Sequence, residues 1–147
     1  MRVIEASIDI DAPLEDVWRT LSAGRHYADW NPFITEVTGD LQVGNRPKLR
    51  IAPPGKKAMT FSPRITAASP TAGLRWKGRL LLPGLCDATH EFLLRAESST
   101  RTRLTQRESF RGILIPMLGS MLEPTRNGFT AMNEALRQRV ESDLQGR

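Results

Sequence analysis

Turn-forming residues interrupt residues 33–112 at short intervals. The spacing of these turns constrains the fold more than any other feature of the sequence. The turns are Gly39-Asp40, Pro53-Pro54-Gly55, Ser69-Pro70-Thr71, Pro83-Gly84 and Glu97-Ser98-Ser99. The segments between them have the lengths of strands: 33–39, 46–52, 57–67, 72–82, 86–97 and 101–112. Short strands joined by tight turns predict an antiparallel meander.

The N-terminal residues 2–10 add a seventh strand, because their apolar and polar residues alternate. One face carries Ile4, Ala6, Ile8 and Ile10, and the other carries polar side chains. This period of two is typical of a strand with one buried face.

Two short helices are predicted between the first strand and the second. Pro13 suits the first turn of a helix, and apolar residues then recur at helical spacing from Leu14 to Leu21. A second helical turn, around His26–Asp29, must end before Pro32. The corner that follows contains Trp30 and Phe33, which fit either a lid at the mouth of a cavity or ordinary core packing.

The last segment, residues 116–143, predicts a long helix. Its apolar side chains follow helical spacing at Leu118, Leu122, Phe129, Met132, Leu136 and Val140. Pro124 lies inside this run and removes one helical hydrogen bond, which predicts a kink or a break near Glu123.

Together these elements predict a single α+β domain spanning residues 1–147. A curved seven-stranded antiparallel sheet would wrap around the long C-terminal helix, since each presents one apolar face. Such a sheet cannot close tightly on a single helix, so we expect a cavity between the two.

The composition is typical of a soluble globular protein, with 39% hydrophobic and 25% charged residues. Cys86 is the only cysteine, which excludes an internal disulfide. No apolar run has the length of a membrane span, and Glu5 and Asp9 occupy the place of a signal peptide's apolar stretch. These features predict a cytoplasmic protein.

The net charge of +5 arises from 21 Lys and Arg against 16 Asp and Glu. The densest cationic group, Arg101, Arg103, Arg107 and Arg111, has the spacing of one strand face and is interpreted as a solvated outer surface. It lacks the interleaved aromatics of a nucleic-acid site, so no nucleic-acid partner is expected. No feature specifies an oligomeric state.

No cofactor or metal site is expected from the motifs. The sequence has no phosphate loop and no dinucleotide-binding glycine signature. His26 and His90 are not spaced as metal ligands.

The hairpin of residues 86–112 is the most informative piece for function. The apolar residues that identify its inner face stand at even-numbered positions on both strands. A loop at Ser98–Thr100 then sets Phe92 opposite Gln106 and His90 opposite Glu108. Opposed Cβ atoms lie about 5 Å apart. We therefore expect His90, Gln106 and Glu108 to point into the interior, with His90 next to Glu108. A slip of one residue would move one strand's set to the outside.

Three interpretations of the His90–Glu108 pair remain open. The pair could act as acid and base on an enolisable carbonyl. It could orient the polar head of a ligand. It could also form only internal hydrogen bonds, because buried pairs are no more than statistical markers of function.

Four stretches together resemble the SRPBCC superfamily of START-like, helix-grip proteins. They are "APLEDVWRTL…WNPF", "LRWKGRL", "ATHEFLL…TRLTQRESFRG" and "LEPTRNGFTAMNEALRQR". Within the superfamily, the chain is most similar to the bacterial polyketide cyclase/dehydrase-like group. The resemblance covers nearly the whole chain and implies the helix-grip fold, although Pro124 departs from the uninterrupted closing helix of that fold. It implies no single activity, because transporters, cyclases and receptors share the scaffold.

The leading functional prediction is a binder of a small hydrophobic molecule, such as a lipid, an isoprenoid or an aromatic polyketide-like compound. Its predicted walls are Trp30, Phe33, Trp76, Phe92, Phe110, Met121 and Phe129, and its orienting groups are His90, Gln106 and Glu108. One alternative is a cyclase or dehydratase-type enzyme that uses His90 and Glu108. The other is a partner-binding module without a ligand.

Overall fold

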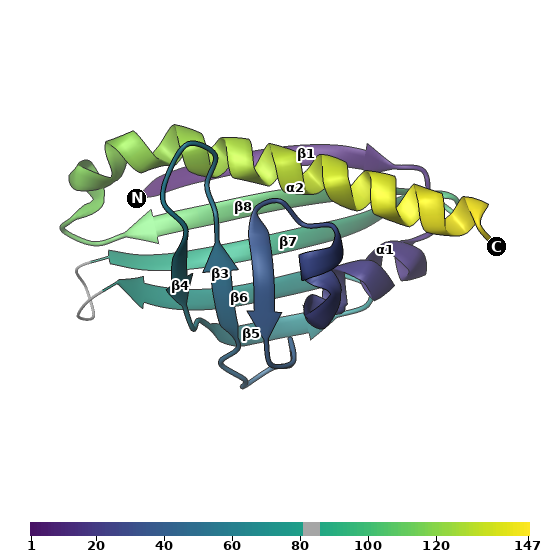
Figure 1. Cartoon of the computed structure of the whole chain (residues 1–147), viewed down its shortest axis with the longest axis horizontal. Coiled ribbons are helices and arrows are strands. Elements are labelled where there is room, and N and C mark those ends of the chain that lie inside the picture. Colours follow the sequence, from purple (N-terminus) through teal and green to yellow (C-terminus); the bar gives the residue numbers. More distant parts are fainter. Residues whose placement is uncertain (81–85) are drawn as a thin grey trace.

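The computed structural model describes residues 1–80 and 86–147, and the predicted turn at Pro83-Gly84 lies outside them. Strands make up the middle of the described chain, and a long helix ends it (Figure 1). The elements in chain order are β1 (Arg2–Ile10), α1 (Leu14–Ser22), η1 (Gly24–Asp29), β2 (Ile34–Thr38), β3 (Lys48–Ile51), β4 (Met59–Phe61), β5 (Arg64–Ser69), β6 (Gly73–Leu80), β7 (Cys86–Ser98), β8 (Arg101–Arg111), η2 (Ile115–Leu118) and α2 (Gly119–Gln145).

Five strands form the main antiparallel sheet, in the order β1-β8-β7-β6-β5. The first strand of the chain, β1, forms one edge of this sheet and pairs with the last strand, β8, where Ile4 lies opposite Glu108. Helix α2 lies along one face of the sheet, nearest to β1 and β8 (Figure 1). The predicted helix-grip arrangement is therefore present.

The prediction of one seven-stranded sheet is wrong. The described residues form eight strands in two sheets, and the second sheet has the order β2-β3-β4. The predicted strand at 57–67 is two strands, β4 and β5, which pair with different neighbours. Pro63 lies between them and has no N–H for a ladder hydrogen bond, so it ends the pairing of β4.

The two short helices form as predicted, and the second is a 3₁₀ helix, η1. The side-chain oxygen of Asn31 then accepts hydrogen bonds from the backbone N–H groups of Phe33 and Ile34, both at 2.9 Å. This side chain fixes the corner and sets the direction in which β2 begins.

Helix α2 continues through Pro124, so the predicted break does not occur. Pro124 has no N–H, so the helix lacks one backbone hydrogen bond, the one to the carbonyl of residue 120 in its first turn. Leu122, only 8% exposed, and the bond from the Thr125 hydroxyl to the carbonyl of Met121 (2.7 Å) hold the neighbouring turn in place.

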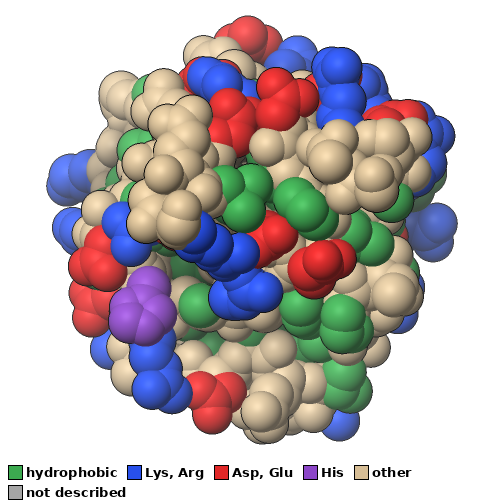
Figure 2. Space-filling view, turned by 90° about the vertical axis from the view of Figure 1, so that its right-hand side faces the viewer, with side chains coloured by type: hydrophobic (Ala, Val, Ile, Leu, Met, Phe, Trp, Pro, Cys, Tyr) green, Lys and Arg blue, Asp and Glu red, His purple; other side chains and the backbone are tan. Residues whose placement is uncertain are grey.

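The outer face of β1 and β8 carries the predicted arginine group. Arg101 and Arg103 each lie 3.1 Å from Asp9, and Arg107 lies 2.8 Å from Glu5. These cross-strand ion pairs agree with a solvated surface. At the end of the molecule where α1 and the last turns of α2 lie, side chains of both charges are also intermixed (Figure 2). No helix in the described part of the chain has the length and apolar character needed to cross a membrane.

Candidate functional site

A cavity of about 160 Å³ lies between the first half of α2, the inner faces of β6–β8 and the β3–β4 hairpin. The hairpin closes one side of it, which the prediction of a single sheet did not provide. The lining residues are Phe33, Ile51, Pro53, Met59, Phe61, Ser62, Pro63, Trp76, Gly78, Arg79, Ala88, His90, Glu108, Phe110, Leu118, Met121, Leu122 and Thr125. Most of the wall is apolar, so water gains few hydrogen bonds inside it.

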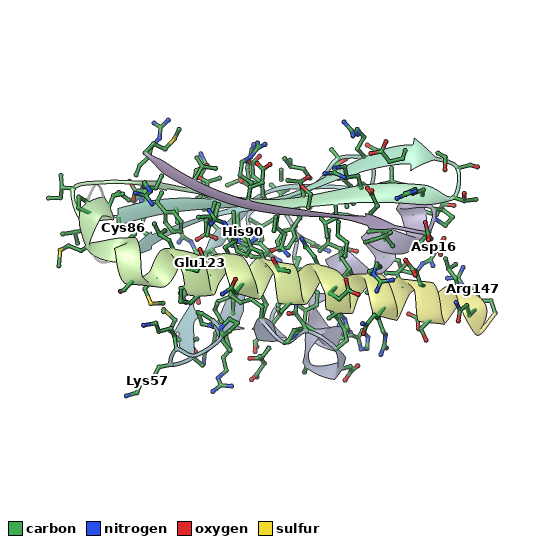
Figure 3. The ribbon with its side chains drawn as sticks, turned by 90° about the horizontal axis from the view of Figure 1, so that it is seen from above. Asp16, Lys57, Cys86, His90, Glu123 and Arg147 are labelled. Atoms are coloured by element: carbon green, nitrogen blue, oxygen red, sulfur yellow. The ribbon has the colours of Figure 1, made fainter. Side chains whose placement is uncertain are left out.

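His90 and Glu108 supply a polar pair at this wall. The predicted register is confirmed, because His90 lies opposite Glu108 and Phe92 lies opposite Gln106. Nδ1 of His90 is 2.6 Å from Oε2 of Glu108. The His90 residue is 4% exposed, whereas the Glu108 side chain is 17% exposed and lines the cavity. Figure 3 shows His90 between the sheet and α2, toward the end of the helix where Glu123 is labelled.

A chain of amides continues from His90 to β1 on the side away from Glu108. Nε2 of His90 is 3.0 Å from Oε1 of Gln106, and the Gln106 amide donates to Oδ1 of Asn133 at 2.7 Å. The Asn133 amide in turn donates to the carbonyl of Ala6 at 3.2 Å. Gln106 and Asn133 are 0% and 2% exposed, so their polar groups depend on each other.

The sequence analysis missed Asn133. Its signal was a polar residue inside the apolar stripe of the last helix, four positions after Phe129 and three before Leu136. A side chain so placed must face the core, where an amide needs partners.

Three aromatic rings surround the imidazole. Its ring centroid lies 4.5 Å from that of Phe92 in a stacked arrangement, 5.0 Å from Trp76 and 4.9 Å from Phe129. These rings fix the orientation of His90 and exclude water from it.

Six of the ten predicted site residues line the cavity, and four do not. The six are Phe33, Trp76, His90, Glu108, Phe110 and Met121. Phe92, Gln106 and Phe129 are fully buried and support the wall from the core side.

Trp30 is the fourth of these residues, and it packs edge-on against Tyr27 at 5.1 Å rather than at the cavity. Phe33 packs against Phe129 at 5.6 Å and is 3% exposed, so it belongs to the core as well as to the wall. The Trp-Asn-Pro-Phe corner therefore contributes mainly to core packing.

The Glu108 carboxylate can accept a hydrogen bond or a proton from a molecule in the cavity, and His90 holds it in place. Cys86 is 1% exposed, and burial raises the pKa of its thiol, which disfavours a reactive thiolate. In the part of the chain that the structure describes, no three His, Cys, Asp or Glu side chains gather as metal ligands would.

Several solved structures share this fold. The aromatase/cyclase Zhui from Streptomyces sp. R1128 is 18% identical, with a TM-score of 0.77 over 97% of this chain and 95% of that one. Protein CV1439 from Chromobacterium violaceum is 21% identical, with a TM-score of 0.71 over 96% and 99%. Ara h 8.0201 is 13% identical, with a TM-score of 0.71 over 96% and 98%. At these identities the likeness concerns the fold alone.

No curated protein matches the sequence. The sequence model of one family, described as polyketide cyclase / dehydrase and lipid transport, matches residues 1–145. This match agrees with the resemblance found in the sequence and with the helix-grip arrangement of the sheet and α2. The chain therefore belongs to the polyketide cyclase / dehydrase and lipid transport family, of the SRPBCC type.

Proposed function

We propose that this protein binds a small, largely hydrophobic molecule in the cavity beneath the first half of α2. The observation that carries the proposal is an apolar space with one polar pair, His90 and Glu108, at its wall. Apolar contact would supply the affinity, and the carboxylate would orient the ligand.

The size of the cavity favours an aromatic ring over a lipid chain. Pockets for drug-sized ligands usually measure about 300–1,000 Å³. An apolar cavity of about 150 Å³ holds a benzene ring. At about 160 Å³, this cavity fits a single ring, or one ring of a polyketide-like molecule, unless α2 moves.

The family description names both cyclases or dehydrases and lipid transport, and Zhui is an aromatase/cyclase. These relatives support a hydrophobic ligand for this chain. They do not distinguish a carrier from an enzyme, so this distinction depends on the residues of the site.

The second candidate is a cyclase or dehydratase-type enzyme. It is favoured by the 2.6 Å contact between His90 and Glu108 at the cavity wall, which resembles a positioned acid–base pair. Glu108→Gln separates the two functions. A binder should retain the ligand with altered affinity, whereas an enzyme should bind it and lose turnover. A module that binds only partner proteins needs no internal cavity, so this cavity does not favour it.

Identification of the native ligand tests binding. The protein is purified from its native host, extracted small molecules are identified by mass spectrometry, and each is added back in a thermal-shift assay. A ligand at one hundred times its Kd should stabilise the fold by about 2.7 kcal/mol. Finding no co-purified compound, together with no shift from a panel of single-ring aromatics and lipids, would contradict the proposal.

A cavity-filling variant assigns the binding to this site. Ala88 lines the cavity, and Thr89 lies on the opposite face of the same strand. Ala88→Leu should abolish binding of any ligand identified, because the added carbons occupy its space. Thr89→Leu, the matched control, should bind as the unmodified protein does. Equal binding by both variants would place the ligand elsewhere.

A further inference from the structure

The amide chain behind His90 has a fixed direction, which is set at its far end. The carbonyl of Ala6 can only accept a hydrogen bond, so the Asn133 group that faces it must be the NH₂. Asn133 therefore turns its oxygen toward Gln106. The Gln106 NH₂ faces that oxygen at 2.7 Å and the carbonyl of Phe129 at 3.4 Å, and both can only accept.

This direction determines whether Nε2 of His90 carries a hydrogen. With its NH₂ committed to α2, Gln106 presents its carbonyl oxygen to Nε2 of His90 at 3.0 Å. An oxygen acceptor requires a donor, so Nε2 carries a hydrogen. Gln106 and Asn133 thus act as positioning residues that keep a hydrogen on Nε2 of His90.

One further proton is shared between Nδ1 of His90 and Oε2 of Glu108 at 2.6 Å. With this proton on Nδ1, the pair is an imidazolium and a carboxylate. With it on Oε2, the pair is a neutral imidazole and a carboxylic acid.

The other oxygen of Glu108, Oε1, is an acceptor in both forms. It is a carboxylate oxygen in the first and a carbonyl oxygen in the second. No group within residues 1–80 and 86–147 donates a hydrogen bond to it, and the side chain lines the cavity. Every proton that the pair possesses points away from the cavity.

We infer that the cavity selects a ligand with a hydrogen-bond donor, such as a phenol or an enol hydroxyl, over an ether, a ketone or a hydrocarbon of the same size. This inference rests on the proposed function, because it specifies the ligand of that same cavity. An aromatic ring would occupy the apolar part, and its hydroxyl would donate to Oε1 of Glu108.

Three single-ring probes test the inference: phenol, anisole and toluene, titrated by calorimetry. A hydrogen bond contributes about 0.5–1.5 kcal/mol with a neutral acceptor and about 1.5–3 kcal/mol with a charged one, so phenol should bind about twofold to a hundredfold more tightly than anisole or toluene. Equal or tighter binding of anisole would overturn the inference and leave the proposed function standing. Binding of none of the three would overturn both.

The variant Glu108→Met removes the acceptor and keeps a side chain of similar length. It should bind toluene at least as tightly as the unmodified protein and should lose the preference for phenol. A preference for phenol that persists in this variant would contradict the role of Glu108. If Glu108→Met no longer binds toluene either, the variant has lost its cavity. The titrations of phenol, anisole and toluene into the unmodified protein then decide whether the cavity prefers a hydrogen-bond donor.

The hydrogen on Nε2 of His90 can be measured directly, without any ligand. In ¹⁵N NMR spectra of the unmodified protein, Nε2 of His90 should resonate as a protonated nitrogen. Asn133→Leu releases the Gln106 amide, and the Nε2 resonance should then move toward the unprotonated position, while toluene binding reports an intact cavity. An unprotonated Nε2 in the unmodified protein would contradict the direction assigned to the hydrogen bonds between Ala6 and His90.

Discussion

Helix α2 has two differently packed parts, and only the part from Gly128 to its C-terminal end is fully packed. In that part Phe129, Met132 and Leu136 are completely buried, and α1 packs against the helix at this end (Figure 1). At the other end, η2 contributes no buried residue and Met117 is 75% exposed. Figure 3 shows Asp16 and Arg147 together at the packed end, where they form an ion pair at 3.0 Å.

The comparison shows where a helix-grip fold can keep a ligand space. The sheet presents an apolar face along its length, but α1 packs against α2 at one end only. At the other end the short β3–β4 hairpin closes the side and leaves about 160 Å³ empty. Stability and binding are therefore assigned to different parts of one helix.

Two leucines should reveal this division most strongly. Leu136 is 0% exposed in the packed part of α2, so Leu136→Ala should cost about 3 kcal/mol of unfolding free energy. Leu118 is half-buried at the cavity, so Leu118→Ala should cost about 1 kcal/mol, because little new void is created. Urea denaturation of both variants measures the difference. Equal losses would show that the two ends are packed alike.

Two glycines sharpen the same comparison with a smaller effect. A Cβ at Gly128 would lie 2.2 Å from the ring of Phe33, whereas a Cβ at Gly119 meets nothing within 4 Å. Gly128→Ala should therefore destabilise the protein by about 2 kcal/mol through overpacking, despite its better helix propensity. Gly119→Ala should be neutral or stabilise by up to about 1 kcal/mol. A stabilising Gly128→Ala would refute the close contact between Phe33 and α2.

Tyr27 gives the smallest effect at neutral pH and a distinct response in alkali. Its hydroxyl donates to the carbonyl of Leu21, and burial raises its pKa far above the ordinary value. Because folding favours the neutral phenol, this stabilisation is complete below about pH 10 and is lost as the pH rises further. Tyr27→Phe should cost about 1 kcal/mol at neutral pH and should flatten the alkaline decline.

The alkaline response has a direct spectroscopic measure, because Tyr27 is the only tyrosine. Tyrosinate absorbance should appear only when the protein unfolds. Its appearance near pH 10 with the far-UV circular dichroism unchanged would mean that the ring is accessible and that this end is loosely packed.

Much of the fold followed from periodicity, because alternation determines which strand face is buried. The shared parity of Phe92 and Leu104, together with the loop predicted at Ser98–Thr100, placed His90 opposite Glu108, as the structure has it. The split at Pro63 was missed, since the apolar residues on either side of it read as one continuous strand. Which strands pair across a long separation depends on tertiary contacts that no local pattern records.

The site was less predictable than the fold. Strand parity brings His90, Gln106 and Glu108 to one face, but it does not say which of them reach an empty space. Gln106 instead meets Asn133 from a helix 27 positions further along the chain. The cavity residues of β3 and β4, such as Ile51 and Met59, were missed because the second sheet was not foreseen.

The vacancy under α2 is the central claim, and xenon binding in a pressurised crystal tests it most directly. Xenon enters dry apolar cavities of this size without needing any polar contact. The account predicts one xenon atom bounded by Ile51, Phe110 and Met121. Electron density in which these side chains meet one another and no xenon enters would contradict it.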